Sequence, residues 1–264
     1  MAGPTASQGR SAADGSPYPD RAGPGFEREV RRMFSHIAAR YEWFDHVASL
    51  GQDYLWRPRA LWALDRFRRG PVARALDVGC GTGELARAVA RRYPGARVTA
   101  TDFTAPMLER ARADRGSARL TDRLDFGRAT ALKLPFAAGT FDLVTNAFVA
   151  RNLIDLPASL REMGRVLRPG GVLLTLEITE PRSATWGRAF HAYFDSVVPA
   201  LGRAVGSEGP YRYLPESLRT LPARHDLIAR LRDAGFDRVE APTQSGGVVT
   251  TFLAEAGRGA DQSR

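Results

Sequence analysis

Gly79, Gly81 and Gly83 stand at alternate positions directly after the apolar run 75–78, and an amphipathic pattern follows them. Glycine adopts positive φ readily and lets a ligand approach the backbone closely, so a strand, a glycine turn and a helix predict a nucleotide-binding corner. The spacing differs from that of dinucleotide turns, whose third glycine packs the helix under a pyrophosphate. The carboxylate of Asp77 would also repel a phosphate. The corner therefore favours a cationic or hydroxyl-rich ligand such as S-adenosylmethionine.

A second carboxylate, Asp102, ends the apolar stretch 97–101 beyond the glycine turn. A carboxylate at this place in a β-α-β unit accepts hydrogen bonds from the two hydroxyls of a ribose. The alternative is an N-cap for a helix that starts near Pro106. Together with the glycine turn, the position favours ribose binding.

The histidines give no pattern typical of a metal centre. His36, His46, His191 and His225 lack metal-ligand spacing supported by carboxylates, and no His-Glu-x-x-His motif occurs. We therefore expect no metal. His191 is interpreted as a helix-packing residue, and the alternative is a place in the lining of a substrate pocket.

The elements that must position these residues follow from an alternation of apolar runs and amphipathic patterns. Such alternation predicts β-α-β units and a mainly parallel sheet with helices on both faces. The expected strands cover residues 74–78, 97–101, 124–129, 141–147, 171–178, 238–241 and 248–254. The expected helices cover residues 84–92, 106–114, 157–167 and 225–233. The predicted fold is thus α/β, with a Rossmann-like, seven-stranded, mostly parallel sheet that binds its ligand at the carboxyl ends of the strands.

Two further helical segments flank this core and can cover its ligand edge. One precedes the first strand and is rich in aromatic side chains, and the other precedes the last helix and the final hairpin. The expected organisation is a disordered tail at 1–25, one domain at 26–256 and a second tail at 257–264. Within the domain we expect a helical lid at 26–70, a cofactor-binding core at 71–180, a helical substrate insert at 181–224, and a C-terminal helix and hairpin at 225–256.

The composition fits a single globular domain with appendages, since 44% of the 264 residues are hydrophobic. The net charge of +9 comes from scattered arginines, which argues against a nucleic-acid partner but leaves an anionic membrane surface open. The single cysteine, Cys80, fits a reducing cytoplasm. No apolar run of about 18 residues exists to span a bilayer, and the first residues lack the apolar core of a signal peptide. We expect a cytoplasmic protein.

Three segments beyond the glycine turn resemble the class I S-adenosylmethionine-dependent methyltransferases. They are Leu134-Pro135-Phe136, the stretch 140–144, and Arg168-Pro169-Gly170-Gly171. In that family the segment before Leu-Pro-Phe lines the adenine, and the Pro-Gly-Gly turn leads into the fifth strand. The match covers about residues 72–180 in the order typical of the family.

Segments outside this core resemble the ubiquinone/menaquinone biosynthesis C-methyltransferase family. They are residues 31–41, Arg151-Asn152, 162–167, 198–202, 211–217, 233–236 and 246–249. The resemblance implies an enzyme that transfers a methyl group from S-adenosylmethionine to a ring carbon of a polyprenylated quinol such as demethylmenaquinol. It also implies a lipophilic quinol partner, no nucleic acid, and peripheral contact at the inner face of the membrane. A homodimer stays open.

The resemblance carries roles over to particular residues. Tyr41 falls in a lid over the site, and Arg151 and Asn152 fall where the family meets its quinol. Cofactor contacts are expected from Asp77, Gly79, Gly81, Thr82, Gly83, Asp102, Phe103, Met107, Thr130, Ala131 and Ala147.

A ring carbon becomes nucleophilic when an adjacent hydroxyl loses its proton. A guanidinium holds its own proton, so Arg151 is not the base. We hypothesise that Arg151 and Asn152 hold the developing phenolate while water or a carboxylate takes the proton. Glu177 is a candidate acceptor, and its alternative role is to pair with a lid arginine.

Three departures from the family pattern bear on the substrate. Thr130 stands in place of an aspartate, Val149-Ala150 replaces Gly-Leu, and residues 250–252 replace a small-His-Arg pattern. Because of them, a second function stays open, namely that of a methyltransferase of the same fold that acts on another small aromatic or secondary metabolite. An NAD-dependent oxidoreductase, an RNA methyltransferase and a non-catalytic cofactor-binding protein are further alternatives, each with less support from the motifs.

Overall fold

The computed structural model describes residues 25, 28, 30, 32, 35, 46, 49–181, 183–198, 200 and 221–257. Tyr41, the two tails apart from Gly25 and Gly257, and segment 211–217 lie outside the described residues. The expectations about them therefore stay predictions.

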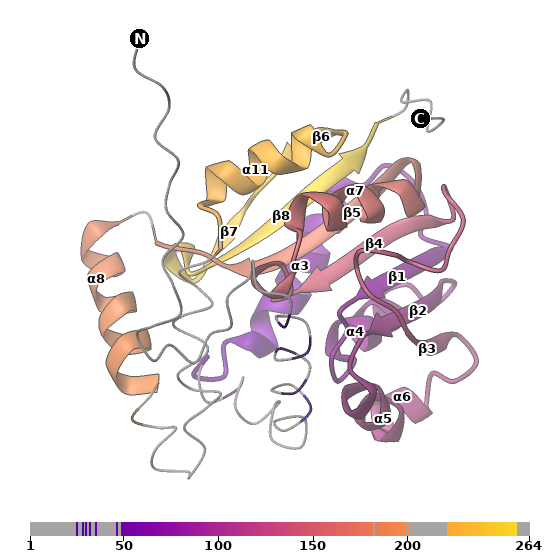
Figure 1. Cartoon of the computed structure of the whole chain (residues 1–264), viewed down its shortest axis with the longest axis horizontal. Coiled ribbons are helices and arrows are strands. Elements are labelled where there is room, and N and C mark those ends of the chain that lie inside the picture. Colours follow the sequence, from indigo (N-terminus) through magenta and orange to yellow (C-terminus); the bar gives the residue numbers. More distant parts are fainter. Residues whose placement is uncertain are drawn as a thin grey trace.

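One eight-stranded sheet runs through the molecule in the order β3-β2-β1-β4-β5-β8-β6, with the short β7 paired to β8 (Figure 1). The strands are β1 (Arg74–Val78), β2 (Arg97–Asp102), β3 (Leu124–Arg128), β4 (Phe141–Ala147), β5 (Leu167–Ile178), β6 (Phe236–Glu240), β7 (Thr243–Gln244) and β8 (Val249–Ala256). Strands β1 to β5 are parallel, and β8 runs antiparallel to both β5 and β6. The seven predicted strands are confirmed, and the two-residue β7 is an addition to them.

Strand β5 begins earlier than the sequence predicts, at Leu167 instead of Gly171. Leu167 pairs with Phe141, and the next pair is Val172 with Leu143, so the register shifts across the Pro-Gly-Gly turn. Gly170 has a φ of 77°, a conformation that a glycine adopts without steric cost. The turn is thus an irregularity inside the strand and not a loop before it.

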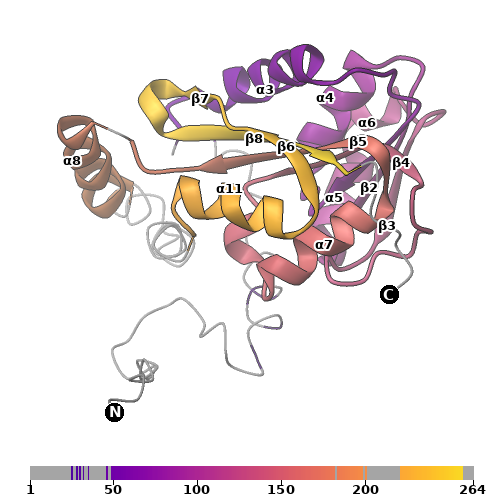
Figure 2. The ribbon, with the colours of Figure 1, turned by 90° about the horizontal axis from the view of Figure 1, so that it is seen from above.

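Helices cover both faces of the sheet, as expected (Figure 2). The helices are α3 (Asp53–Phe67), α4 (Glu84–Arg92), α5 (Ala105–Ala113), α6 (Arg115–Ala118), α7 (Leu156–Val166), α8 (Ala184–Ala192) and α11 (Arg224–Asp233), with short turns η1 (Ala150–Asn152), η2 (Tyr193–Val197) and η3 (Ser245–Gly247). Helices α3 and α4 pack on one face, and α7 and α11 pack on the other. Among the described residues, no helix is long and apolar enough to cross a bilayer.

The buried strands are apolar at successive positions because both of their faces are covered. Ala75 and Leu143 join the core under α3 and α4, whereas their neighbours Leu76 and Val144 join the core under α7 and α11. This split follows from the two-residue period of a strand. It holds the strands rigidly and so fixes where their carboxyl ends lie.

The chain order creates a crevice between β1 and β4. The chain moves outward from β1 to β2 and β3, then returns to the other side of β1 as β4. Open α/β sheets bind ligands at such a switch point, beyond the carboxyl ends of the strands. The glycine turn follows β1 at this point.

Candidate active site

The glycine turn is a tight corner that requires its glycines. Gly79, Gly81 and Gly83 all have positive φ, at 68°, 53° and 86°. The backbone N–H groups of Gly79 and Cys80 both donate to the carbonyl of Thr101, at 2.7 and 3.0 Å. This pairing ties the turn to the end of β2.

The side chain of Asp102 is hydrogen-bonded to the same turn. Its carboxylate accepts hydrogen bonds from the backbone N–H groups of Gly81 and Thr104, at 2.9 and 2.8 Å. Burial raises the pKa of Asp102, and these hydrogen bonds oppose the shift. The N-cap of α5 is Thr104, so the alternative N-cap role for Asp102 is wrong.

Asp77 has a carboxylate that is only half satisfied. It is 1% exposed, its Oδ1 accepts from the hydroxyl of Thr145 at 2.7 Å, and its Oδ2 has no hydrogen-bond partner among the described residues. Burial raises the pKa of Asp77 to about 7, and the hydrogen bond from Thr145, the backbone N–H of Ala86 and the charge of Arg57 oppose this shift. A buried oxygen without a partner is costly, so a bound donor is the chemistry that it fits.

Two cavities meet at Gly79. The first, which we call the turn cavity, is lined by residues that include Arg57, Asp77, Gly81, Thr82, Glu84 and Ala147. The second, the apolar cavity, is lined by residues that include Val78, Phe103, Thr130, Ala131, Val149 and Asn152. The structure thus brings most of the expected cofactor residues to one crevice.

Asp102, Gly83 and Met107 line neither of these two cavities. Gly83 is the N-cap of α4, and a Cβ there would lie 3.0 Å from the ring of Phe126. Met107 is buried in α5. Gly83 and Met107 therefore belong to the packing of α4 and α5 and do not line either cavity.

Arg151 is buried in an ion pair with Glu177. The Nη1–Oε1 distance is 2.7 Å, and the two side chains are 6% and 0% exposed. Glu177 also accepts from the backbone N–H groups of Ala150 and Ile178, at 3.0 and 3.1 Å. Burial raises the pKa of Glu177, and the guanidinium of Arg151 opposes the shift. The alternative role of Glu177 was to pair with a lid arginine; the arginine with which it pairs in the structure is Arg151, from η1.

Arg151 and Asn152 face different surroundings although they are neighbours. The guanidinium of Arg151 lies 5.8 Å from the centroid of the Phe148 ring, beside Glu177. Asn152 lines the apolar cavity with Thr130. Asn152 is thus on the side of the expected adenine contacts.

Phe148 is a site residue that the sequence reasoning missed. It follows β4 with a φ of 60°, a strained conformation for a bulky residue that is typical of functional sites. Its ring lines the turn cavity and makes an edge contact with Trp56 at 6.0 Å. An aromatic residue at the end of a central strand was the available signal, but a strained φ cannot be read from sequence.

A larger cavity of about 530 Å³, the β5 cavity, opens beyond the carboxyl end of β5. Ile178, Phe190, Phe194 and Leu221 give it an apolar lining, and His191 and Arg224 are among its polar residues. His191 is half exposed on α8 and lines this cavity, so its interpretation as a packed helix residue is wrong. Its Nε2 lies 3.5 Å from a carboxylate oxygen of Glu180.

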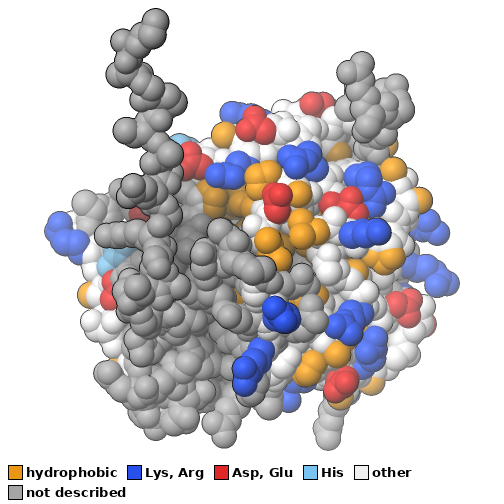
Figure 3. Space-filling model, viewed as in Figure 1, with side chains coloured by type: hydrophobic (Ala, Val, Ile, Leu, Met, Phe, Trp, Pro, Cys, Tyr) orange, Lys and Arg blue, Asp and Glu red, His pale blue; other side chains and the backbone are white. Residues whose placement is uncertain are grey.

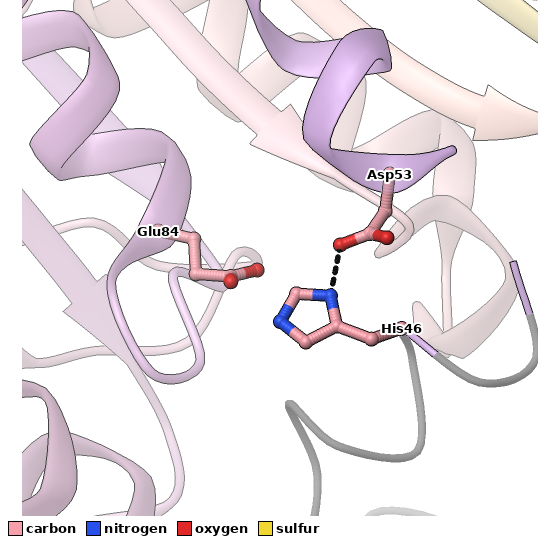
Figure 4. A group of neighbouring side chains, drawn as sticks. All are labelled: His46, Asp53 and Glu84. Carbon is pink, nitrogen blue, oxygen red and sulfur yellow. Dashed lines mark hydrogen bonds and ion pairs between the residues drawn. The ribbon is translucent and has the colours of Figure 1, made fainter. Parts of the chain in front are cut away.

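A charged cluster borders the turn cavity. His46, Asp53 at the start of α3 and Glu84 at the start of α4 point toward one another (Figure 4). His46 Nδ1 lies 2.5 Å from Asp53 Oδ2, and the guanidinium of Arg57 contacts the carboxylates of both Asp53 and Glu84. An arginine of the chain thus meets the negative charge of this cluster. The expectation of no metal stays a prediction.

Comparisons with known proteins show the family of this chain. The model of the ubiE/COQ5 methyltransferase family matches residues 25–255. The chain is 44% identical over 206 residues to a demethylmenaquinone methyltransferase of Thermus thermophilus, covering 77% of this chain and 91% of the relative. It is 39% identical over 227 residues to that of Deinococcus radiodurans, covering 86% and 91%.

Solved structures show the same fold at lower identity. A SAM-dependent methyltransferase of Thermotoga maritima, a possible histamine N-methyltransferase, matches with a TM-score of 0.59 at 17% identity, covering 86% of this chain and 99% of that one. The [4+2]-cyclase SpnF matches with a TM-score of 0.58 at 20% identity, covering 77% and 81%. A fold shared by such different enzymes does not define the reaction. The family match does, and this chain is a methyltransferase that belongs to the ubiE/COQ5 methyltransferase family.

Proposed function

We propose that this enzyme transfers a methyl group from S-adenosylmethionine to a ring carbon of a polyprenylated quinol such as demethylmenaquinol. The family match over residues 25–255 and the names of the relatives support this reaction. The observation that carries it in the structure is the crevice at Gly79, where a buried carboxylate oxygen of Asp77 lacks a partner.

The residues of the crevice fit the proposed cofactor. The Oδ2 atom of Asp77 suits the ammonium of its amino-acid group, and the carboxylate of Asp102 at the carboxyl end of β2 suits the ribose hydroxyls. The apolar cavity with Phe103, Thr130 and Ala131 suits the adenine. When bound, this cofactor supplies a methyl group made electrophilic by the sulfonium.

The chain's own residues would then orient the acceptor and exclude water. Ala147 and Phe148 line the turn cavity at the end of β4, and Phe148 also contacts the guanidinium of Arg151. We assign to Arg151 the stabilisation of a phenolate that forms on the quinol, because a buried guanidinium stays charged. Glu177 positions Arg151 through their ion pair. The proton acceptor is water or a carboxylate other than Glu177, which is committed to three donors.

The β5 cavity is the candidate site for the lipophilic part of the acceptor. Its volume of about 530 Å³ lies in the range of small-molecule sites, and Phe190, Phe194 and Leu221 are apolar. It opens beyond Ile178, directly after Glu177. A quinol ring near Arg151 would therefore have apolar surface beside it.

The departures from the family pattern differ in their consequences. Thr250, Thr251 and Phe252 are buried inside β8, and Thr250 exchanges a hydrogen bond with Thr179 at 2.7 Å. These three side chains therefore take part in the packing of the sheet. Val149 instead lines the apolar cavity and packs on Gly79. Its bulk favours the second candidate, a methyltransferase for another small aromatic acceptor.

An assay with two phases tests the acceptor. The enzyme is incubated with methyl-labelled S-adenosylmethionine and demethylmenaquinol, and the label is read in the lipid phase. We expect label in the ring-methylated quinol. Cofactor binding without transfer to any prenylated quinol, together with transfer to a small unprenylated phenol, would favour the second candidate.

We also propose that the enzyme works at a membrane surface, where such a quinol dissolves. Helix α3 supports this with the exposed side chains of Leu55 and Trp62 and the basic side chains of Arg59 and Arg66 between and beside them. The guanidinium of Arg66 lies 4.9 Å from the Trp62 ring centroid. Basic residues beside aromatic ones are typical of surfaces that meet anionic lipids.

A further inference from the structure

We propose that Arg57 binds the α-carboxylate of the cofactor while Asp77 binds its α-ammonium, so that the bound cofactor ties helix α3 to the turn after β1. This inference rests on the proposed use of S-adenosylmethionine. It adds a specific receptor for the amino-acid end and gives α3 a part in cofactor recognition.

Arg57 reaches the turn cavity from outside the cofactor core. Its side chain is 12% exposed, lies on α3 and lines the same cavity as Asp77. The Nε atom of Arg57 is buried without a hydrogen-bond partner among the described residues. Its Nη2 pairs with the carboxylate of Glu84, and its Nη1 makes only long contacts to Asp53, at 3.4 Å to the carbonyl and 3.5 Å to the carboxylate. Since a guanidinium has five N–H donors, Arg57 retains donors for a further acceptor.

The charges around the cavity identify the acceptor. Arg57 is the one basic side chain among the described residues that line it, and Asp77 and Glu84 supply two carboxylates. Glu84 already pairs with Arg57, whereas Asp77 has no ion pair among the described residues and keeps an unpartnered oxygen. A ligand with a cationic group for Asp77 and a carboxylate for the remaining donors of Arg57 complements this set.

The unpartnered atoms give the same assignment independently of charge. Asp77 Oδ2 needs a donor and Arg57 Nε needs an acceptor, and both residues line one cavity. An α-amino acid group presents a donor and an acceptor on one carbon atom. It therefore satisfies both buried atoms at once, which no single hydroxyl or amine does as well.

A purely structural role for Arg57 is the competing explanation. Its guanidinium contacts Asp53 and Glu84, and Asp53 is itself held by the hydroxyl of Ser49 at 2.7 Å and by His46. In that case Arg57 would stabilise the packing of α3 against α4, and its replacement would weaken the binding of every ligand of the crevice to the same extent. The two explanations differ in how they depend on the ligand's amino-acid group.

Calorimetric titration with two ligands separates them. S-adenosylhomocysteine carries the amino-acid group, whereas 5′-methylthioadenosine lacks it. We expect Arg57→Gln to weaken binding of S-adenosylhomocysteine by about tenfold or more and to leave binding of 5′-methylthioadenosine unchanged. Arg57→Lys keeps the positive charge but loses the bidentate geometry of the guanidinium. Its affinity for S-adenosylhomocysteine should therefore fall less than that of Arg57→Gln.

The matched control is Arg59→Gln, which removes an exposed charge from the same helix. It should bind both ligands as the unmodified protein does. The binding of the cofactor's carboxylate by Arg57 would be overturned by either of two results. One is an equal loss of affinity for both ligands in Arg57→Gln and Arg57→Lys, and the other is no loss of affinity for either ligand. If the unmodified protein bound neither ligand, the proposed cofactor itself would be wrong, so the two failures are distinguishable.

Discussion

Asp77 is a buried residue whose ionisation should be visible in the stability of the protein. Burial raises its pKa from the ordinary value of 3.8 to about 7 in the folded state. A carboxyl group with a raised folded pKa binds more protons folded than unfolded between these values. Its stabilising effect is complete below the unfolded pKa and is lost as the pH rises through the folded pKa.

We therefore expect Asp77→Asn to become relatively more stable as the pH rises. The difference in unfolding free energy between the variant and the unmodified protein should shift in favour of the variant by roughly 2 kcal/mol between about pH 5 and pH 8. Urea denaturation at each pH measures it. The amide is neutral throughout, so a difference that stays constant with pH would contradict a raised pKa.

Arg151 and Glu177 form a buried pair in which each residue depends on the other. Arg151→Met leaves a buried carboxylate without its counter-charge, and we expect a loss of about 3 kcal/mol in unfolding free energy. Adding Glu177→Gln removes that charge and keeps an acceptor for the backbone of Ala150, so most of the stability should return. Chemical denaturation of both variants measures this.

The same pair of variants tests the role of Arg151 in the reaction. If Arg151 stabilises a phenolate, the double variant should be stable and bind cofactor normally but transfer methyl groups poorly. Recovery of transfer along with stability would show that Arg151 serves only the fold of η1 and β5.

At the scale of elements, the turn after β1 and the residues after β4 are packed against each other. A Cβ on Gly79 would lie 2.8 Å from Cγ2 of Val149, and Gly79 has a φ of 68°. Two separate costs thus oppose a side chain here, namely the clash and the positive φ. This contact also closes the boundary between the turn cavity and the apolar cavity.

We expect Gly79→Ala to destabilise the protein by about 2 kcal/mol and to weaken cofactor binding. Val149→Gly in the same chain removes the clash but not the positive φ, so it should recover part of the loss. Thermal unfolding and calorimetric titration check both effects. Gly95→Ala, where a Cβ meets open space, is the matched control.

At the scale of the whole molecule, charge is spread over the surface. Figure 3 shows Lys and Arg side chains dispersed among acidic and apolar ones on the visible described face, without one dense patch. A nucleic-acid partner would need a clustered basic surface, and the expectation of no such partner stays a prediction. Exposed aromatic and basic side chains coincide on helix α3, and they do so again on α8 with Trp186 and Arg188.

We expect the protein to float with vesicles that contain anionic lipid, and the double variant Leu55→Ser/Trp62→Ser to float less. Both side chains are at least half exposed, so the fold should tolerate their replacement. Val197→Ser changes an exposed apolar side chain on η2, away from α3, and serves as the control. Equal flotation of all three proteins would show that α3 is not the lipid contact.

Much of the fold could be predicted because strands and helices leave local patterns. The glycine turn, the apolar strands and the amphipathic helices appear within a residue or a few of their predicted positions, apart from the start of β5 and the short β7. These patterns report burial on one or both faces, which depends on neighbours along the chain. The two-residue β7 is too short to leave such a pattern.

The sequence by itself determined the glycine turn after β1 and placed Asp77 and Asp102 at the ends of neighbouring strands, because both features depend on local spacing. Only the tertiary structure decided which side chains meet there. It paired Arg151 with Glu177, put Asn152 beside Thr130, and brought Arg57 from α3 to face Asp77. Such meetings join residues that are 20 to 26 positions apart in the chain, a separation over which no periodic pattern carries information.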